Sequence, residues 1–334
     1  MHTPRNPVLF GGAALIALTG CSGSPHPNPT FTAPLEPAVL AASETKPATP
    51  QVTWAQDGTL NVGDSIVTVE FPRQLPAPEA DLHRWIGTAA HAISAYYGRY
   101  PVRRATIEVQ GTRNGKVHGG VTYEGKLIRI HVGRDTRPAD LDDDWMITHE
   151  MFHLAYPDLD DQYLWMEEGM ADYLEPLARA RIGTLSAEQV WSGYVDGMPK
   201  GQPEAGDQGL DRTHTWGRTY WGGAIFWLLA DVRVREQTAN RRTIDDAFRA
   251  VLDAGGDGSV HWPLDKVIEV SDRATGTHVL KTLHEEMGEK PKVVDLDALW
   301  AKLGVVRRGD HLTFDDTAPL AAVRQSMTSK GMAE

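Results

Sequence analysis

The sequence predicts an α+β protein, with a small α/β lobe followed by a mainly helical lobe. Between residues 51 and 139, short runs with strand character flank one long helical pattern. From residue 140 to residue 334, apolar residues recur mostly at helical spacing. Hydrophobic residues make up 41% of the 334-residue chain and charged residues 23%, which is enough apolar content for a sizeable core.

The elements of the first lobe follow from the period of the apolar residues. These residues alternate with polar ones in the expected strands and recur every third or fourth position in the expected helix. The expected elements are a helix at residues 80–97 and strands at residues 59–62, 65–71, 104–110 and 126–132.

Charge and cysteine content exclude several classes of protein. The 33 Lys and Arg residues against 45 Asp and Glu residues give a net charge of −12, which argues against a nucleic-acid partner. The only cysteine cannot form an intrachain disulfide or a multi-cysteine metal site. Any metal ion must therefore be bound mainly by His, Asp or Glu.

The N-terminal segment has the pattern of a secretory signal. An apolar stretch at residues 8–18 ends in Leu-Thr-Gly-Cys at residues 18–21, which resembles the lipobox of bacterial lipoproteins. The resemblance implies that residues 1–20 are removed and that Cys21 is lipidated. A Pro-rich tether at residues 21–50 would then join the lipid to a periplasm-facing domain in the bacterial cell envelope, with the outer membrane favoured. The alternative is that Cys21 is an ordinary buried residue.

The most informative motif is His149-Glu150-x-x-His153, in a helix expected to begin near Asp140 and to end at Pro157. The two histidines are four residues apart on one helix face, so both imidazoles could bind one metal ion. Glu150 could then hold a water molecule as a general base. The alternative is that the two histidines are only packed on the helix.

A third ligand is offered by Glu168, in a second helix expected at residues 161–175 that Pro176 should end or kink. Two histidines and one glutamate would bind one Zn²⁺ per chain and leave a position for water. Asp172, one helical turn after Glu168, could accept a hydrogen bond from the remote nitrogen of His149. The alternative for Asp172 is a solvated charge on the helix surface.

The residues around Glu168 resemble those of gluzincin metallopeptidases. The segment Trp-Met-Glu-Glu-Gly-Met-Ala-Asp-Tyr at residues 165–173 is similar to the Trp-Leu-Asn-Glu-Gly-Phe-Ala-x-Tyr segment of the alanyl-type aminopeptidases, where the Glu before Gly binds zinc. Residues 219–249 resemble the glycyl-aminopeptidase family, and Tyr220 matches a Tyr that stabilises the oxyanion opposite zinc. The resemblance implies a thermolysin-like fold. The alternative for Tyr220 is packing among its aromatic neighbours.

An expected edge strand upstream of the motif departs from the family pattern. Gly119 and Gly120 match its glycine pair and would let an extended peptide pair closely with the strand. Thr122 stands where these aminopeptidases have a Glu that binds the free amino group of the substrate. The acids that could substitute for it are Glu124, expected on the same strand face two residues on, and Glu167, which lies beside Glu168.

Together these features predict a membrane-tethered zinc metallopeptidase that acts on peptides or proteins, with internal peptide bonds preferred over amino-terminal ones. Aminopeptidase activity is the first alternative. A binding lipoprotein with the same fold and weak catalysis is the second, and the intact Glu150 argues against it. A protein that only binds zinc is the third, and the open metal position argues against that one.

Overall fold

The computed structural model describes residues 49–329. Cys21, the expected signal peptide at residues 1–20 and nearly all of the expected tether lie outside these residues. Within the described part, every helix is too short or too polar to cross a bilayer.

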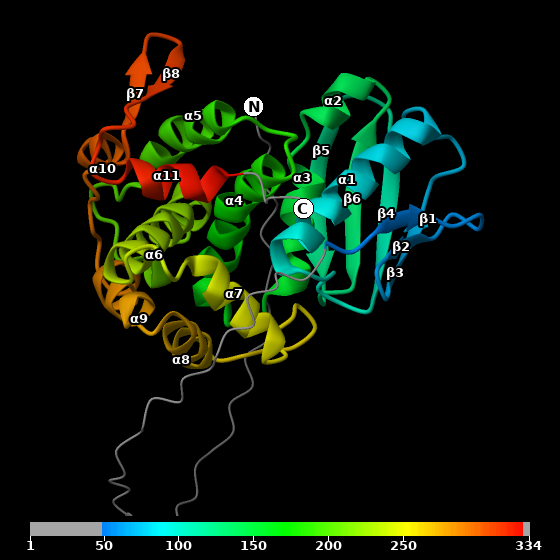
Figure 1. The fold of residues 1–334 in the computed structure, drawn as a ribbon. Coiled ribbons are helices and arrows are strands. Elements are labelled where there is room, and N and C mark those ends of the chain that lie inside the picture. The colour runs from blue at the N-terminus through cyan, green and yellow to red at the C-terminus, as the bar shows by residue number, and fades with distance from the viewer. Residues whose placement is uncertain (1–48, 330–334) are drawn as a thin grey trace, which may run out of the picture. The chain divides into compact units, whose positions relative to one another are not determined.

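Six strands form one mixed sheet in the order β1-β2-β3-β4-β6-β5 (Figure 1). Strands β3, β4 and β6 run parallel, whereas β5 pairs antiparallel with β6. Because β5 is the last strand in this order, it forms one edge of the sheet. The strands are β1 Val52–Trp54, β2 Leu60–Val62, β3 Ser65–Glu70, β4 Arg104–Thr112, β5 Val117–Tyr123 and β6 Leu127–Gly133.

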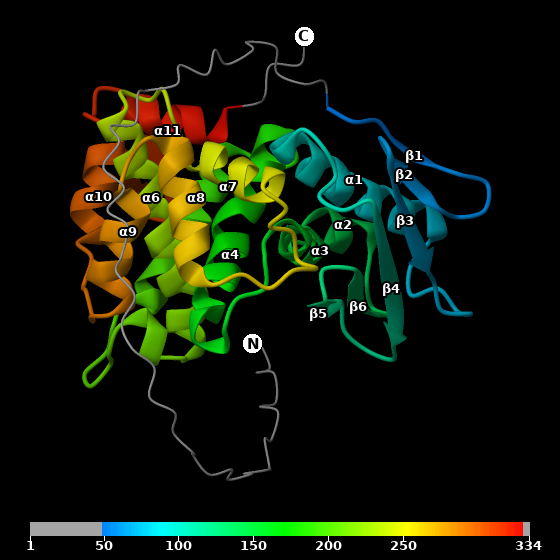
Figure 2. The same cartoon turned by 90° about the horizontal axis from the view of Figure 1, so that it is seen from below.

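Helix α1, Glu79–Tyr97, connects β3 to β4. Its apolar residues recur every three to four positions, and Leu82 and Ile86 on that face are fully buried. Gly98 ends the helix at a φ of 76°, a left-handed conformation that glycine adopts without strain. Figure 2 shows α1 and α3, Met146–Phe152, between the sheet and the remaining helices.

The expectation that a helix starts near Asp140 and continues through the histidines is wrong. Asp140 belongs to a separate short helix, α2 Pro138–Asp142, and α3 begins only at Met146. Asp144, just before α3, accepts a hydrogen bond from the Trp85 indole at 2.9 Å. This contact with α1 selects one acid from a run of acidic residues that look equivalent in the sequence.

Helix α4, Leu164–Arg181, continues past the proline that was expected to end or kink it. Leu174 and Leu177, on either side of Pro176, are fully buried. Burial of these side chains outweighs the cost of about 3 kcal/mol that a proline imposes inside a helix. Of the two effects expected of Pro176, the helix end is therefore wrong, because tertiary packing overrides local propensity, and the kink stays a prediction.

Helix α4 crosses α6, Gly223–Gln237, through two glycines. A β-carbon on Gly169 would lie 2.3 Å from the backbone of Gly223, and one on Gly223 would lie 2.1 Å from the carbonyl oxygen of Trp165. Only glycine permits such a close approach at both positions. This crossing fixes the part of α4 that carries Glu168.

Further helices and one hairpin complete the described chain. The sequence predicted mainly helices in this region and did not predict the hairpin of β7, Val305–Arg308, and β8, His311–Phe314. Each strand has only four residues, too few for a strand period to be told from a helical one. The other elements are η1 His153–Ala155, η2 Asp161–Tyr163, α5 Ala187–Gly197, η3 Met198–Gly201, η4 Leu210–Arg212, η5 Arg218–Gly222, α7 Ile244–Asp253, α8 Leu264–Thr275, α9 Val279–Leu283, η6 His284–Gly288, α10 Leu296–Leu303 and α11 Ala321–Thr328.

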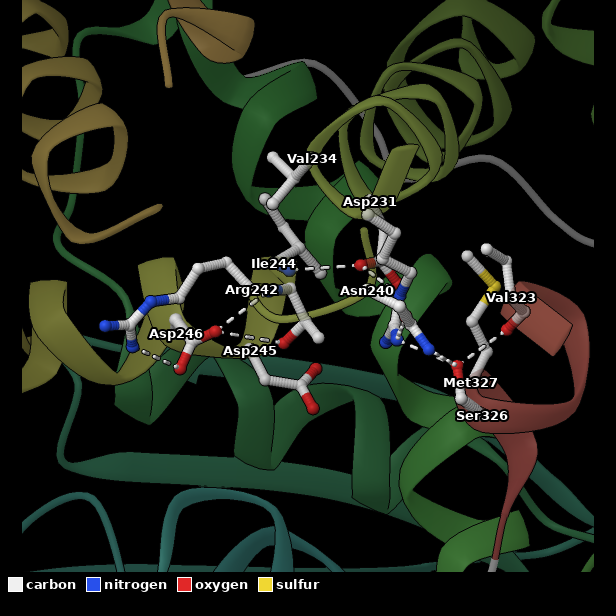
Figure 3. Close-up of polar contacts among 12 residues, drawn as sticks. Asp231, Val234, Asn240, Arg242, Ile244, Asp245, Asp246, Val323, Ser326 and Met327 are labelled. Carbon is white, nitrogen blue, oxygen red and sulfur yellow. Dashed lines mark hydrogen bonds and ion pairs between the residues drawn. The ribbon is translucent and has the colours of Figure 1, made fainter. Parts of the chain in front are cut away.

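A buried polar network joins α4, α6, α7 and α11. Asp231 of α6 is fully buried, and its carboxylate accepts hydrogen bonds from the Ile244 main chain at 3.0 Å and from Arg235 at 2.8 Å (Figure 3). Asp245 of α7 accepts a hydrogen bond from Arg181 of α4 at 2.6 Å, and Arg181 also donates to a main-chain oxygen of α11. These buried charges are paired, which offsets the cost of removing them from water.

Asp245→Asn is expected to lower the free energy of unfolding at pH 7 by about 3–5 kcal/mol, because the mostly buried Arg181, only 14% exposed, would lose its carboxylate partner. Burial acts to raise the pKa of Asp245, but the charges of Arg181 and Arg249 outweigh it and hold the pKa at about 2. The ionised carboxylate therefore stabilises the fold above about pH 4, and this contribution is lost as the pH falls through about 2.

Thermal unfolding of the wild type and of Asp245→Asn between pH 7 and pH 2.5 measures this effect, and the gap between the two proteins should narrow below about pH 4. Asp253→Asn is the control, because Asp253 lies at the end of the same helix and pairs with Arg99 at the surface. Its loss should stay below about 1 kcal/mol. Equal losses in the two variants would contradict the account.

Candidate metal centre

Three side chains from neighbouring elements converge in the interior of the described protein. His149 lies in α3, His153 begins η1, and Glu168 lies in α4. Oε2 of Glu168 is 3.1 Å from Nε2 of His149 and 3.6 Å from Nε2 of His153. One donor atom from each of the three residues lies within 4.8 Å of the other two. The structure thus brings together the three residues expected as metal ligands.

This arrangement fits a tetrahedral zinc ion. With bonds of about 2.1 Å, neighbouring donors of a tetrahedral site lie about 3.4 Å apart. The two measured donor separations of 3.1 and 3.6 Å lie on either side of that value. Two imidazoles and one carboxylate are ligands that zinc accepts, and three protein ligands leave a fourth position for water or substrate.

Asp172 contacts the face of His149 that is turned away from the other ligands. Its Oδ1 atom lies 3.1 Å from Nδ1 of His149, and its side chain is only 12% exposed. The alternative of a solvated helix charge does not fit this burial. A carboxylate at this nitrogen orients the imidazole ring and strengthens Nε2 as a metal ligand.

The electrostatics of the metal-free centre favour protonated imidazoles. Burial acts to lower the pKa of His149, but the carboxylates of Asp172 and Glu168 outweigh it and raise that pKa. Burial opposes protonation of His153 too, and Glu168, with a smaller contribution from Glu150, raises its pKa. Because zinc binds neutral imidazole, metal binding must release these protons.

Glu150 lies against the edge strand β5 and is buried. The Thr122 hydroxyl is 2.8 Å from the main-chain oxygen of Glu150 and 2.9 Å from its Oε2 atom. A β-carbon on Gly120 would lie 2.6 Å from Cγ of Glu150, whereas one on Gly119 would face His131. The two glycines therefore have different surroundings, and their pairing with a substrate stays a prediction.

Tyr220 lies in η5, a π-helical turn directly before α6. Its ring stacks with that of His149, with 6.3 Å between the ring centroids, and with that of Trp216, with 6.0 Å between them. Trp216 is 49% exposed, so this series of rings leads from the centre to the surface. Tyr220 thus lies beside the expected ligands, and π-helical turns are frequent at functional sites.

Glu124 and Glu167, the two acids considered as substitutes for the carboxylate that Thr122 replaces, both lie outside β5. Glu124 is exposed and lies in the turn after β5 with a φ of 48°, so the expectation that it continues the strand face is wrong. Glu124 and Gly125 both have positive φ, as a tight hairpin turn requires, and this turn ends the strand. Glu167 accepts a hydrogen bond from the main chain of Leu159 at 3.0 Å, and burial raises its pKa to about 7.

Two residues near the centre were missed from the sequence. Thr122 was considered only as a missing acid, although its position two residues after Gly120 places both on one face of a strand. Trp216 was not considered, although it precedes Tyr220 by four residues, a spacing that brings side chains together on a helix.

No protein-family model and no curated protein matches the chain. Solved structures do match it. An aminopeptidase N family protein from Idiomarina loihiensis matches with a TM-score of 0.57 and 16% identity, over 77% of this chain and 49% of that one. Two further matches are weaker. An M1 zinc metallopeptidase from Deinococcus radiodurans matches with a TM-score of 0.44 and 15% identity, over 70% of this chain and 48% of that one. An aminopeptidase A from Legionella pneumophila matches with a TM-score of 0.47 and 14% identity, over 72% of this chain and 28% of that one.

The first of these matches shows a shared fold and confirms the expected mixed α and β class. The match spans about half the length of the Idiomarina protein.

The purified protein is expected to bind one zinc ion per chain. Glu150→Gln should bind the same amount, because Glu150 is not among the three converging donors, whereas His153→Ala should bind little. His261→Ala is the matched control, because His261 is exposed and contacts only surface acids in the described structure. Metal analysis after dialysis measures the stoichiometry.

Zinc at a thousand times its dissociation constant would add about 4.1 kcal/mol to the free energy of unfolding, so a chelator should lower the thermal midpoint of the wild type. A midpoint that does not respond to zinc, or full zinc occupancy in His153→Ala, would contradict this assignment.

Proposed function

We propose that the chain is a zinc-dependent metallopeptidase that hydrolyses peptide bonds. The observation that carries the proposal is the convergence of His149, His153 and Glu168 at separations that suit zinc. The shared fold with an aminopeptidase N family protein supports it. A protein that only stores or binds zinc tends to fill all four positions, whereas three protein ligands leave one open.

The chain's own residues have separate roles in this proposal. When bound, zinc would polarise the scissile carbonyl and make a water molecule more acidic. Glu150 accepts the proton of the attacking water and passes it to the leaving amine. Tyr220 donates a hydrogen bond to the developing oxyanion. The outer edge of β5 offers main-chain groups that can pair with an extended peptide.

We further propose that the enzyme acts at amino termini. The fold match with an aminopeptidase N family protein favours this alternative over the initial expectation of internal cleavage. The centre also contains three acids, Glu150, Glu168 and Asp172, against the two positive charges of one zinc ion, and this remaining excess favours a substrate with a positively charged amino group.

Cleavage of internal bonds is the second candidate, and Thr122 is the observation that favours it. A buried ammonium group needs a carboxylate partner, and Thr122 supplies only a hydroxyl, which already contacts Glu150. An extended peptide without a free amino group would need only the main chain of β5.

A single peptide tested with a free and with an acetylated amino terminus separates the two candidates. The zinc-loaded protein is expected to cleave the free form with a kcat/KM at least about tenfold higher, because acetylation removes a charge worth that much beside these acids. Glu150→Gln should lose nearly all hydrolysis while it keeps its zinc.

Equal or faster cleavage of the acetylated peptide would contradict the amino-terminal preference and favour the second candidate. No cleavage of any member of a peptide library by the zinc-loaded wild type would contradict the peptidase proposal itself.

We also propose, on the tetrapeptide at residues 18–21 alone, that Cys21 is lipidated and attaches the domain to the membrane on its periplasmic face. Cys21→Ser is expected to move the protein from the membrane fraction to the soluble fraction after cell lysis. A variant that still sediments with membranes would contradict this attachment.

A further inference from the structure

Two residues of the edge strand β5, Gly120 and Thr122, lie against the carboxylate of Glu150. The Thr122 hydroxyl lies 2.9 Å from Oε2, within hydrogen-bond distance. On the other side, a β-carbon on Gly120 would lie 2.8 Å from Oε1, so this oxygen fits only against a glycine. Both carboxylate oxygens of Glu150 are therefore adjacent to β5, one at each of the two residues.

Strand geometry explains why these two residues act together. Side chains two residues apart on a strand point to the same face, so positions 120 and 122 both face Glu150. The intervening residue, Val121, points to the opposite face. β5 is in turn held by β6, in which Ile130 pairs with Gly120 and Ile128 pairs with Thr122. Ile128 and Ile130 are fully buried, so the strand that contacts Glu150 rests on a packed core.

We propose that Thr122 is a positioning residue, whose hydroxyl orients the Glu150 carboxylate for proton transfer during peptide hydrolysis. The proposal rests on the proposed function, in which Glu150 is the general base. Thr122 does not touch the three converging donors in this scheme and acts only through Glu150. Its contact with the Glu150 main chain, at 2.8 Å, also ties the strand to α3.

A hydroxyl suits this role because it can donate a hydrogen bond to a carboxylate oxygen. While Glu150 is a carboxylate, Thr122 donates its proton to Oε2. The same hydroxyl lies 2.8 Å from the main-chain oxygen of Glu150, so its own position is fixed by α3 as well as by β5. A donor held in this way restricts the orientations that the carboxylate can adopt.

Other side chains at this position would not have the same effect. Valine has the shape of threonine but no hydrogen-bonding group, so Oε2 of Glu150 would lose this partner. Glutamate would place a second negative charge beside Glu150, which opposes its ionised form. Serine keeps the hydroxyl and loses only a methyl group.

The test compares zinc-loaded Thr122→Val and Thr122→Ser with the wild type on the best peptide substrate. Thr122→Val is expected to lower kcat by about 10- to 100-fold, because a misoriented base transfers the proton less often. KM should change less than about threefold. Thr122→Ser should recover kcat to within about fivefold of the wild type, because it restores the hydrogen-bond donor.

Thr106→Val is the matched control. Thr106 lies on β4 next to Ile107. Ile107 pairs with Ile128 of β6, and Ile128 pairs with Thr122 of β5, so Ile107 and Thr122 lie on the same face of the sheet. Because neighbouring residues on a strand point to opposite faces, Thr106 points away from Glu150. Its substitution removes one hydroxyl from the same sheet and should leave kcat and zinc content unchanged.

Wild-type kcat in Thr122→Val, or equal losses in Thr122→Val and Thr122→Ser, would overturn the proposal. Loss of zinc from Thr122→Val would also overturn it, because Thr122 would then support the metal centre itself.

Crystal structures of the zinc-loaded proteins provide a readout that needs no turnover. In Thr122→Val the Glu150 carboxylate should leave its position against β5, and an unchanged carboxylate overturns the proposal. Failure of the wild type to cleave peptides contradicts the proposed function instead and leaves the structural comparison intact.

Discussion

The close crossing of α4 and α6 is the constraint on which the rest of the centre depends. Gly169 and Gly223 bring the two helix backbones to a distance that any β-carbon would prevent. Glu168, next to Gly169 on α4, is thereby held 3.1 Å from His149 on α3. Asp172 follows one helical turn later and reaches the second nitrogen of the same imidazole. One packing contact thus sets the position of an expected ligand and of the carboxylate that orients another.

The centre brings together acids and imidazoles that would be costly to bury separately. Glu168 and Asp172 approach His149 from its two nitrogens, and both raise its pKa against the effect of burial. Burial acts to raise the pKa of Glu168 as well, yet the hydrogen bond from His149 and the ion pair with His153 hold that pKa well below its usual range. The excess of negative charge suits a divalent cation, because a cation replaces protons that the imidazoles otherwise hold. The geometry and the electrostatics therefore indicate the same occupant.

The sequence predicted the features that local spacing determines. The four-residue interval between His149 and His153 places both on one side of a helical segment, and β2, β3, β4 and β6 follow from their alternation. β5 was expected from the family resemblance of its glycine pair, and β1 was not expected. The start of α3 was predicted wrongly, because the contact between Trp85 and Asp144 joins residues far apart in the chain. The continuation of α4 beyond Pro176 depends on burial that the sequence does not display. The contact of Thr122 with Glu150 depends likewise on how β5 packs against α3.

The expected metal ligands, the proposed general base and the edge strand form one continuous structure, in which α3, η1 and α4 carry the expected ligands and β5 contacts the proposed base. The central claim of this account is that His149, His153 and Glu168 bind one zinc ion. Anomalous diffraction at the zinc absorption edge, from crystals of the protein purified with zinc, tests this claim most directly. The account predicts one strong peak at about 2.0–2.2 Å from Nε2 of each histidine and from a carboxylate oxygen of Glu168. Zinc bound elsewhere on the chain, with these three side chains apart from it, would contradict the account.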